Sequence, residues 1–284
     1  MKIGLIDLGG KFPNLALMKL SAYHKAKGDT VELVGPLYAG IYDKIYASAV
    51  FTWTPLPVFS INEIGGPAIG PLPVLPPEIN DLCPDYSLYK IDYSMGYTTR
   101  GCNRNCMECF VPELEGGIRP EHDIDIFLRH DKAVLLDNNA LAHPWGISQI
   151  ENIARREVKV DYCQGFDARL IDGAVARLLA KVRFFQPLRL ACDNVSMIVP
   201  VNKAVERLRA AGVTPSRYAC YVLVKDIPTA IARVEFLRAI NVDPFAQPFR
   251  DRDGSEPPEI HRRFARWVNH KAIFKTVRWQ DYNG

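Results

Sequence analysis

The chain contains 284 residues, enough for one or two domains with a sizeable buried core. Its 35 Lys and Arg residues nearly balance its 32 Asp and Glu residues, and the net charge of +3 excludes a polycation for nucleic acid and a charged disordered tail. The sequence has no run of about 18 apolar residues that would predict a transmembrane helix. An acid and a glycine pair follow the N-terminus too soon for a signal peptide, so we expect a cytoplasmic protein with no membrane partner.

The first 85 residues or so predict a small α/β unit. A helical pattern begins after Pro13 and ends at Gly28, and apolar segments around it predict three strands, at residues 2–6, 30–34 and 44–52. From Pro55 to Pro84 the chain is rich in proline but keeps apolar side chains, namely Val58, Phe59, Ile61, Ile64, Ile69, Leu72, Val74 and Leu75. We interpret this segment as an extended linker that docks on a neighbouring surface, with a free disordered linker as the alternative.

From Tyr86 onward the pattern alternates between strand and helix. We expect six strands, at residues 93–99, 133–137, 158–163, 188–192, 217–224 and 244–248. Helices are expected between them, at residues 146–157, 171–182 and 201–211 and after the capping residue Asp226. Six βα units in series predict an α/β fold with a parallel sheet, curved into a partial (β/α)6 barrel, because a full eight-unit barrel usually needs about 250 residues.

Three of the seven cysteines, Cys102, Cys106 and Cys109, lie within eight residues directly after the first barrel strand. In a reducing compartment such a cluster indicates metal chemistry rather than disulfides. Three thiolates on one short loop can converge on an iron–sulfur cluster, which normally takes four, so that one iron keeps an open position for a substrate or cofactor. A loop after a barrel strand lies at the face where such folds place their chemistry.

The spacing Cys102-x3-Cys106-x2-Cys109 after a barrel strand resembles the radical S-adenosylmethionine (radical SAM) superfamily. The resemblance implies a [4Fe–4S] cluster on these three cysteines and SAM bound to the open iron through its amino and carboxylate groups. It further implies reductive cleavage of SAM to methionine and a 5′-deoxyadenosyl radical that takes hydrogen from a substrate. A low-potential electron donor such as flavodoxin or ferredoxin would be the partner.

Residues 65–67, 83–89, 96–112 and 115–116 are similar to the radical SAM branch with an N-terminal cobalamin-binding-like domain. The resemblance divides the chain into a truncated cobalamin-binding-like unit with its linker (1–85), a core barrel (86–256) and a C-terminal tail (257–284). A complete domain of the first kind has about five strands, whereas we predict three. The Asp-x-His-x-x-Gly signature is absent around His24, and we expect that cobalamin does not bind.

The resemblance also places SAM near polar residues at the strand ends. Glu108 stands where the family usually has an aromatic residue beside the adenine of SAM. Asp137, Asn138 and Asn139 follow the second strand, where the family binds the SAM amino group, although a polar turn with an Asx cap is the alternative for each.

Four further residues are expected at this site. Gln164 or Arg169 would meet the methionine carboxylate or the substrate, with an ion pair of Arg169 to a neighbouring acid as the alternative. Asp193 would bind the ribose hydroxyls, or cap the next helix. Val224 would border adenine, or belong to the core.

Other interpretations of the cysteines stay open. A zinc site would need a fourth ligand, for which His122 is the nearest candidate. Cys106 and Cys109 alone resemble a thioredoxin-like redox pair, which leaves Cys102 unexplained. Cys163, Cys192 and Cys220 fall in three successive barrel strands, where packing is the ordinary role and exchange of a hydrogen atom with a substrate is the sharper hypothesis.

The tail from Glu259 to Gly284 interleaves basic and aromatic residues. This pattern predicts an amphipathic helix closing the barrel, with Phe264, Trp267 and Val268 inward, in preference to a surface for nucleic acid. The sequence therefore predicts a radical SAM enzyme with an unidentified substrate, for which a nucleotide or nucleobase, a peptide and a small metabolite are candidates. The alternatives are an iron–sulfur protein for electron transfer or redox sensing and a zinc-stabilised nucleic-acid-binding protein.

Overall fold

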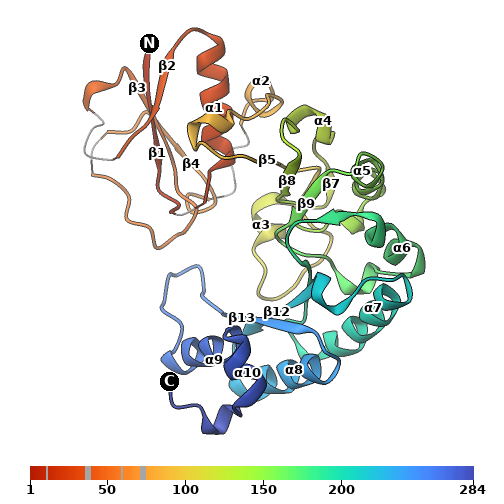
Figure 1. Ribbon diagram of the computed structural model, residues 1–284. Coiled ribbons are helices and arrows are strands. Elements are labelled where there is room, and N and C mark those ends of the chain that lie inside the picture. Colours follow the sequence, from red (N-terminus) through yellow and green to blue (C-terminus); the bar gives the residue numbers. More distant parts are fainter. Residues whose placement is uncertain (11, 36–39, 59, 71–74) are drawn as a thin grey trace. The chain divides into compact units, whose positions relative to one another are not determined.

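The computed structural model describes residues 1–10, 12–35, 40–58, 60–70 and 75–284 (Figure 1). The chain forms two compact units, each described here by itself. The first unit comprises residues 1–138 and 252–254, and the second comprises residues 139–251 and 255–284. The domain boundaries that we expect after residues 85 and 256 come from the family resemblance, whereas the two units are defined by compactness. The expected boundaries stay predictions.

The first unit begins with a parallel sheet in the order β2-β1-β3-β4. Its strands are β1 (Lys2–Asp7), β2 (Thr30–Leu33), β3 (Lys44–Ser48) and β4 (Glu63–Gly65). We predicted only three of them. The fourth comes from the proline-rich segment, where Ile64 lies opposite Ala47. A three-residue strand among prolines is too short to show a period, so the sequence did not reveal it.

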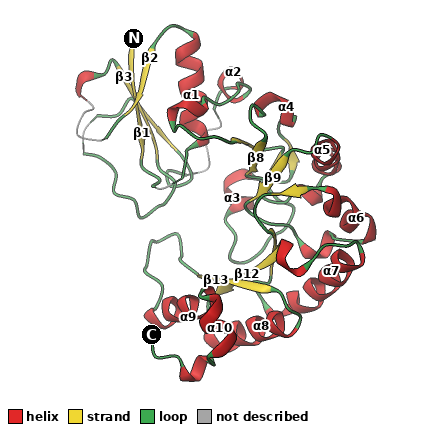
Figure 2. Cartoon of the chain, viewed as in Figure 1, coloured by secondary structure: helices red, strands yellow, loops and turns green. Residues whose placement is uncertain are grey.

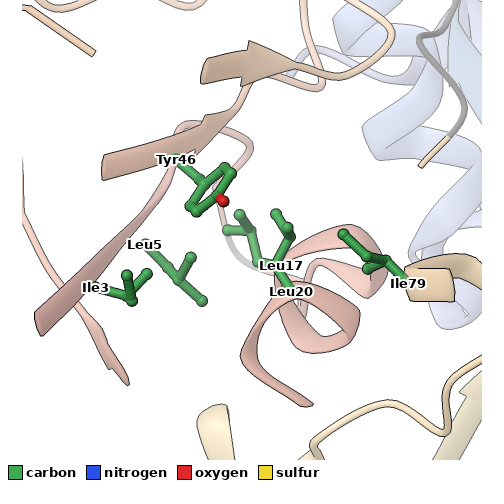
Figure 3. Close-up of a cluster of buried hydrophobic side chains, with 6 residues drawn as sticks. All are labelled: Ile3, Leu5, Leu17, Leu20, Tyr46 and Ile79. Carbon is green, nitrogen blue, oxygen red and sulfur yellow. The ribbon is translucent and has the colours of Figure 1, made fainter. Parts of the chain in front are cut away.

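Helix α1 (Leu15–Ala26) packs on one face of this sheet. Its N-cap Asn14 accepts a hydrogen bond from the backbone N–H of Leu17 at 3.2 Å, which satisfies one of the free amides of the first turn. Figure 3 shows the resulting cluster, to which β1, β3, α1 and α2 (Pro77–Asn80) contribute Ile3, Leu5, Leu17, Leu20, Tyr46 and Ile79.

The predicted docking of the proline-rich segment holds for part of it. Ile61 and Ile64 pack against a second cluster around Ile6, while Leu75 packs against the cluster of Figure 3. Val58 is fully exposed and Ile69 is 40% exposed, so the docking expected for these two residues is wrong. Phe59, Leu72 and Val74 lie outside the described residues.

The remainder of the first unit carries the three clustered cysteines, Cys102, Cys106 and Cys109. Strands β5 (Ser94–Gly96) and β8 (Lys132–Leu135) pair in parallel, and β6 (Thr99–Arg100) and β7 (Arg119–Pro120) pair antiparallel. Two short helices complete it, α3 (Val111–Glu115) and α4 (Ile124–Phe127). We predicted one strand over residues 93–99. It divides because the backbone amides of Thr98 and Thr99 donate to the side chain of Asp137 instead of extending the β5 ladder.

The second unit alternates strands and helices (Figure 2). Strand β9 (Lys159–Tyr162) pairs in parallel with β10 (Arg183–Phe184), and a bridge from Phe166 to Leu190 continues it onto β11 (Leu188–Ala191). Strand β11 pairs in parallel with β12 (Tyr218–Val224), and β12 with β13 (Asp243–Pro248). All six strands expected after residue 86 are present, within a few residues of their predicted bounds, and β7 and β10 are additional.

The helices between these strands are also those expected. They are α5 (Pro144–Arg155), α6 (Gly173–Lys181), α7 (Ile198–Ala210) and α8 (Ile227–Ala239). Asp226 caps α8 as predicted, because its side chain accepts a hydrogen bond from the backbone N–H of Thr229 at 2.9 Å. Among the described residues, no helix is both long and apolar enough to cross a membrane.

The C-terminal tail is helical. It forms α9 (Glu259–Asn269) and α10 (Lys271–Thr276), and α9 buries Phe264, Trp267 and Val268 as predicted. The indole N–H of Trp267 donates to the carbonyl of Val277 at 3.0 Å. The guanidinium of Arg238 lies 4.0 Å from the ring centre of Phe274. The buried aromatic faces of the tail are therefore occupied by packing within the second unit.

Candidate metal and cofactor site

A loop of residues 101–117, here called the cysteine loop, carries Cys102, Cys106 and Cys109. The β6–β7 pair closes its base, and the N–H of Cys102 donates to the carbonyl of Gly116 at 3.2 Å. Gly101 has φ +78°, and a β-carbon there would lie 2.4 Å from the carbonyl oxygen of Gly117. Only glycine permits this closure, because it tolerates the positive φ and leaves room for the opposing backbone.

Glu115, at the end of α3, ties the loop together. Its Oε2 accepts hydrogen bonds from the N–H of Gly101 at 3.2 Å and from the side-chain amide of Asn138 at 2.7 Å. Its Oε1 lies 3.5 Å from the guanidinium of Arg100. One carboxylate therefore joins both ends of the loop to the residues that follow β8.

The three cysteines of the loop are not joined in disulfides. Cys106 and Cys109 are exposed and Cys102 is half-buried. In the part of the chain that the structure describes, no three Cys, His, Asp or Glu side chains stand close enough to hold a metal ion. The donor set nevertheless fits an iron–sulfur cluster, because three accessible thiols on one loop can turn toward a common centre and thiolates are the ligands that such clusters take.

His122 does not complete a zinc site with these thiols. It is buried, and its Nε2 lies 3.2 Å from the Oδ1 of Asp81. Burial lowers the pKa of the imidazole below its ordinary value. The Nε2 of His122 is therefore engaged by Asp81, and the fourth ligand that the zinc alternative needs stays a prediction.

Asp137 holds the entry to the cysteine loop. It is 1% exposed, and its carboxylate accepts four hydrogen bonds of 2.5–3.0 Å, from the backbone amides and the hydroxyls of Thr98 and Thr99. Burial raises the pKa of this carboxyl, while the four hydrogen bonds oppose that effect. Its expected bond to the SAM amino group stays a prediction, and here the carboxylate binds the chain itself.

The other predicted residues of the first unit lie close to the loop. Asn138 is half-buried and bound to Glu115, and Glu108 is half-buried within the loop itself. Asn139 belongs to the second unit, where it is 4% exposed at the start of a 3-10 helix over Ala140–Ala142. Of the predicted residues outside the loop, Asn138 bonds directly to it, through Glu115.

The predicted residues after β9 are both exposed. Gln164 follows the strand directly, as expected. Arg169 makes two bonds with Asp167, of 2.7 Å from its Nε and 3.0 Å from its Nη2. This is the ion-pair alternative, so an anionic group of SAM or of a substrate would have to compete with Asp167 for the guanidinium.

The structure brings Asp193 and Val224 together at the ends of β11 and β12. The Oδ1 of Asp193 accepts a hydrogen bond from the N–H of Leu223 at 3.1 Å. Asp193 is exposed, whereas Val224 is fully buried. The two residues occupy the strand ends where they were expected, and their contacts to SAM stay predictions.

Sequence reasoning missed the buried Arg233, which braces these strand ends from α8. Its Nη1 lies 2.8–2.9 Å from the carbonyl oxygens of Cys192, Asp193 and Leu223. It is 1% exposed. The available signal was a cationic residue on the otherwise apolar inward face of a predicted helix, since a buried cation requires acceptors.

The three barrel cysteines are packed inside the second unit. Cys192 and Cys220 are fully buried, and Cys163 is half-buried. Burial raises the pKa of Cys192 to about 12 and that of Cys220 well above its ordinary value. Both thiols are therefore protonated at neutral pH, which agrees with the packing interpretation.

Comparison with known proteins indicates the fold. No family model and no curated protein matches the sequence. Among solved structures, the cobalamin-dependent S-adenosylmethionine radical enzyme OxsB, with aqua-cobalamin and S-adenosylmethionine bound, matches with a TM-score of 0.56 and 13% identity over 96% of this chain. This chain spans 56% of OxsB. SuiB of Streptococcus suis, bound to its precursor peptide SuiA, matches 70% of this chain and 50% of its own, with a TM-score of 0.45 and 12% identity.

The likeness to OxsB confirms the predicted fold class. The chain has an α/β fold similar to that of OxsB, with parallel strands of a partial barrel and, earlier in the sequence, a small Rossmann-like sheet. The cysteine loop directly follows β5 and β6, so it comes after a strand as the sequence predicts.

The N-terminal unit offers no imidazole ligand for a cobalamin at His24. The Nδ1 of His24 lies 2.7 Å from Asp29 and its Nε2 lies 2.9 Å from the hydroxyl of Tyr46. Both ring nitrogens are occupied in a buried position. Because this residue does not fit that role, we derive no chemistry through cobalamin, and the expectation that it does not bind stays a prediction.

Proposed function

We propose that this protein is a radical SAM enzyme in which Cys102, Cys106 and Cys109 hold a [4Fe–4S] cluster and SAM binds its open iron. The observation that carries the proposal is the glycine-closed loop with three accessible thiols, directly after the first strands of a fold like that of OxsB. When bound, these groups supply reductive cleavage of SAM to methionine and a 5′-deoxyadenosyl radical, which takes a hydrogen atom from the substrate.

The chain's own residues hold and shield this chemistry. Asp137 fixes the turn between β5 and β6, and Glu115 fixes the base of the loop. Asn138, bonded to Glu115, provides a polar group beside the loop. Gln164, Asp193 and Val224, at strand ends of the second unit, stay the residues that the resemblance assigns to SAM. In the second unit, helix α9 covers β13 with apolar side chains, which excludes water from that part of the barrel.

An electron must reach the cluster from outside. The exposed Cys106 and Cys109 flank Met107, which is 90% exposed, so the tip of the loop is open to a protein donor. A low-potential carrier such as flavodoxin or ferredoxin fits this requirement. The substrate is proposed only as a molecule with an abstractable hydrogen, a nucleotide and a peptide being candidates.

Cluster binding is tested by anaerobic reconstitution with iron and sulfide. Wild-type protein should hold about four irons per chain and show a brown colour, since one [4Fe–4S] cluster contains four irons and the three thiolates of the loop would hold it. The triple variant Cys102→Ala/Cys106→Ala/Cys109→Ala should hold almost none. Cys83→Ala, a half-buried cysteine outside the loop, is the matched control and should load as wild type.

Two results would contradict the assignment of the cluster. One is iron loading in the triple variant equal to that of wild type. The other is a colourless wild-type protein that binds one zinc ion per chain and no iron. A change in the electron paramagnetic resonance signal of the reduced cluster when SAM is added would support SAM as its ligand.

A further inference from the structure

A cavity of about 540 Å³ lies inside the first unit, away from the cysteine thiols. Helices α1 and α2, strands β3 and β4 and the base of the cysteine loop line it. Small-molecule pockets usually fall within about 300–1,000 Å³ and are mostly apolar with a few placed polar groups. Much of this wall is apolar, with Leu20, Tyr23, Ile64, Leu75 and Ile79.

Lys19 on α1 is a charged residue buried in this wall. It is 5% exposed, and its Nζ donates to two oxygens of one residue, the backbone and side-chain carbonyls of Asn80. Among the described residues, no carboxylate lies within ion-pair distance of its ammonium. An ammonium group has three N–H donors, so one remains after the two bonds to Asn80.

Nearby charges do not neutralise Lys19. Glu121 is the acid that acts on it most strongly, but its Oε1 accepts from the Asn80 amide at 3.1 Å and lies 3.7 Å from Arg100. Arg100 and Lys19 repel each other, and Asp81 contributes less than either. Burial therefore prevails and lowers the pKa of Lys19 to about 8.

The second lysine of the cavity is different. The Nζ of Lys44 lies 2.6 Å from the Oε1 of Glu63, and the side chain is partly exposed. Its charge is already compensated by that carboxylate. Of the two lysines that line the cavity, only Lys19 is a buried cation without an ion pair among the residues described.

We propose that this cavity is a binding site for a small ligand with an apolar body and a single carboxylate, which pairs with the ammonium of Lys19. A buried cation is costly without a counter-ion, and a carboxylate in the cavity would supply one. Glu63 is paired with Lys44 and Glu115 lies beside Arg100, so Lys19 offers a single uncompensated positive charge, which a single carboxylate matches better than a doubly charged phosphate does. The apolar wall accommodates the rest of the molecule.

Matched pairs of probes test this assignment by calorimetry at pH 7. Benzoate, phenylacetate, 3-phenylpropionate and 4-phenylbutyrate would each be compared with the corresponding primary amide. At least one acid should bind the wild type about tenfold more tightly than its amide, because only the acid pairs with the ammonium. Lys19→Met should remove this preference, and Lys44→Met should keep it.

Three outcomes would overturn the proposal. They are the absence of binding by all four acids, equal binding of acid and amide by the wild type, and an unchanged preference in Lys19→Met. If Lys19→Met does not fold, two measurements still test the proposal: the acid–amide comparison on the wild type, and binding of the acid by the variant Leu75→Trp. That variant fills the cavity from another wall, so it should abolish binding of the acid, and retained binding would place the site elsewhere.

Discussion

Lys19 shows at the scale of one residue how burial and charge compete. Because its pKa falls from 10.5 to about 8 on folding, the unfolded chain binds this proton more tightly than the folded one. The free-energy cost of burying the charged ammonium is therefore present in full below about pH 8 and disappears as the pH rises toward 10.5. The free energy of unfolding of the wild type, relative to Lys19→Met, should therefore rise with pH in this window, by at most about 3 kcal/mol.

Urea unfolding at several pH values measures this difference. Lys44→Met is the matched control, since the ion pair with Glu63 raises the pKa of Lys44 instead. Its difference from wild type should not rise between pH 8 and 10.5. A flat difference for Lys19→Met would show that the ammonium is solvated in the folded protein.

Asp137 is predicted to be a positioning residue for the cysteine loop. In Asp137→Asn one carboxylate oxygen becomes an NH2 group, which cannot accept from Thr98 or Thr99. We expect a loss of about 2 kcal/mol in the free energy of unfolding and a clear loss of bound iron. Asp172→Asn, which changes an exposed helix cap far along the chain, should leave iron content unchanged. Full iron loading in Asp137→Asn would contradict the positioning role.

These residues explain why the sequence could not assign the site in detail. A polar residue at a strand end has two uses, to bind a ligand or to bind the neighbouring backbone. Asp137, Arg169 and Asp193 were expected to bind SAM, and each bonds to a nearby part of its own chain. Lys19 gave no signal, since nothing in a single sequence shows that a lysine is buried without a carboxylate.

At the scale of elements, length decided what was predictable. Helices α5, α6 and α7 and strand β12 have clear periods and were found from them, whereas α8 was found from its capping residue Asp226. Strands of two or three residues, such as β4, β6 and β10, show no period. They form because a partner strand or side chain is already in place. Before β6, for example, the carboxylate of Asp137 accepts a hydrogen bond from the backbone N–H of Thr99.

The closure of the cysteine loop makes an element-scale prediction. Gly101→Ala would force a positive φ on alanine and place its β-carbon against the carbonyl of Gly117, so the loop base should open and iron should be lost. Gly28→Ala is the matched control, because it has φ +83° with open space around it. This variant should lower the free energy of unfolding by about 1 kcal/mol and bind iron as the wild type does. Equal iron loss in both variants, or in neither, would contradict this account of the loop.

The tail makes a second prediction at this scale. Trp267→Ala should lower the free energy of unfolding by about 3–5 kcal/mol, because it removes a fully buried ring from the contact of α9 with the core. Ile260→Ala on the same helix, where the side chain is 39% exposed, should cost under about 1 kcal/mol. A small effect of Trp267→Ala in thermal or urea unfolding would mean that the tail is not part of the packed unit.

At the scale of the molecule, the alternation of strand and helix determined the fold class, and the cysteine spacing determined where to look for chemistry. Both features follow from local patterns, since parallel strands need crossover helices and a cluster needs thiolates on one loop. The substrate does not follow from either. It depends on side chains from several strand ends acting together, whose contacts no single stretch of sequence encodes.

The most direct test of the central claim is formation of 5′-deoxyadenosine. Reconstituted protein would be reduced with dithionite under anaerobic conditions, given SAM, and the product quantified by chromatography beside the Cys102→Ala/Cys106→Ala/Cys109→Ala variant. We predict 5′-deoxyadenosine from the wild type and none from the variant. Absence of product from wild-type protein carrying a full cluster, together with a cluster paramagnetic resonance signal that SAM leaves unchanged, would contradict the assignment as a radical SAM enzyme.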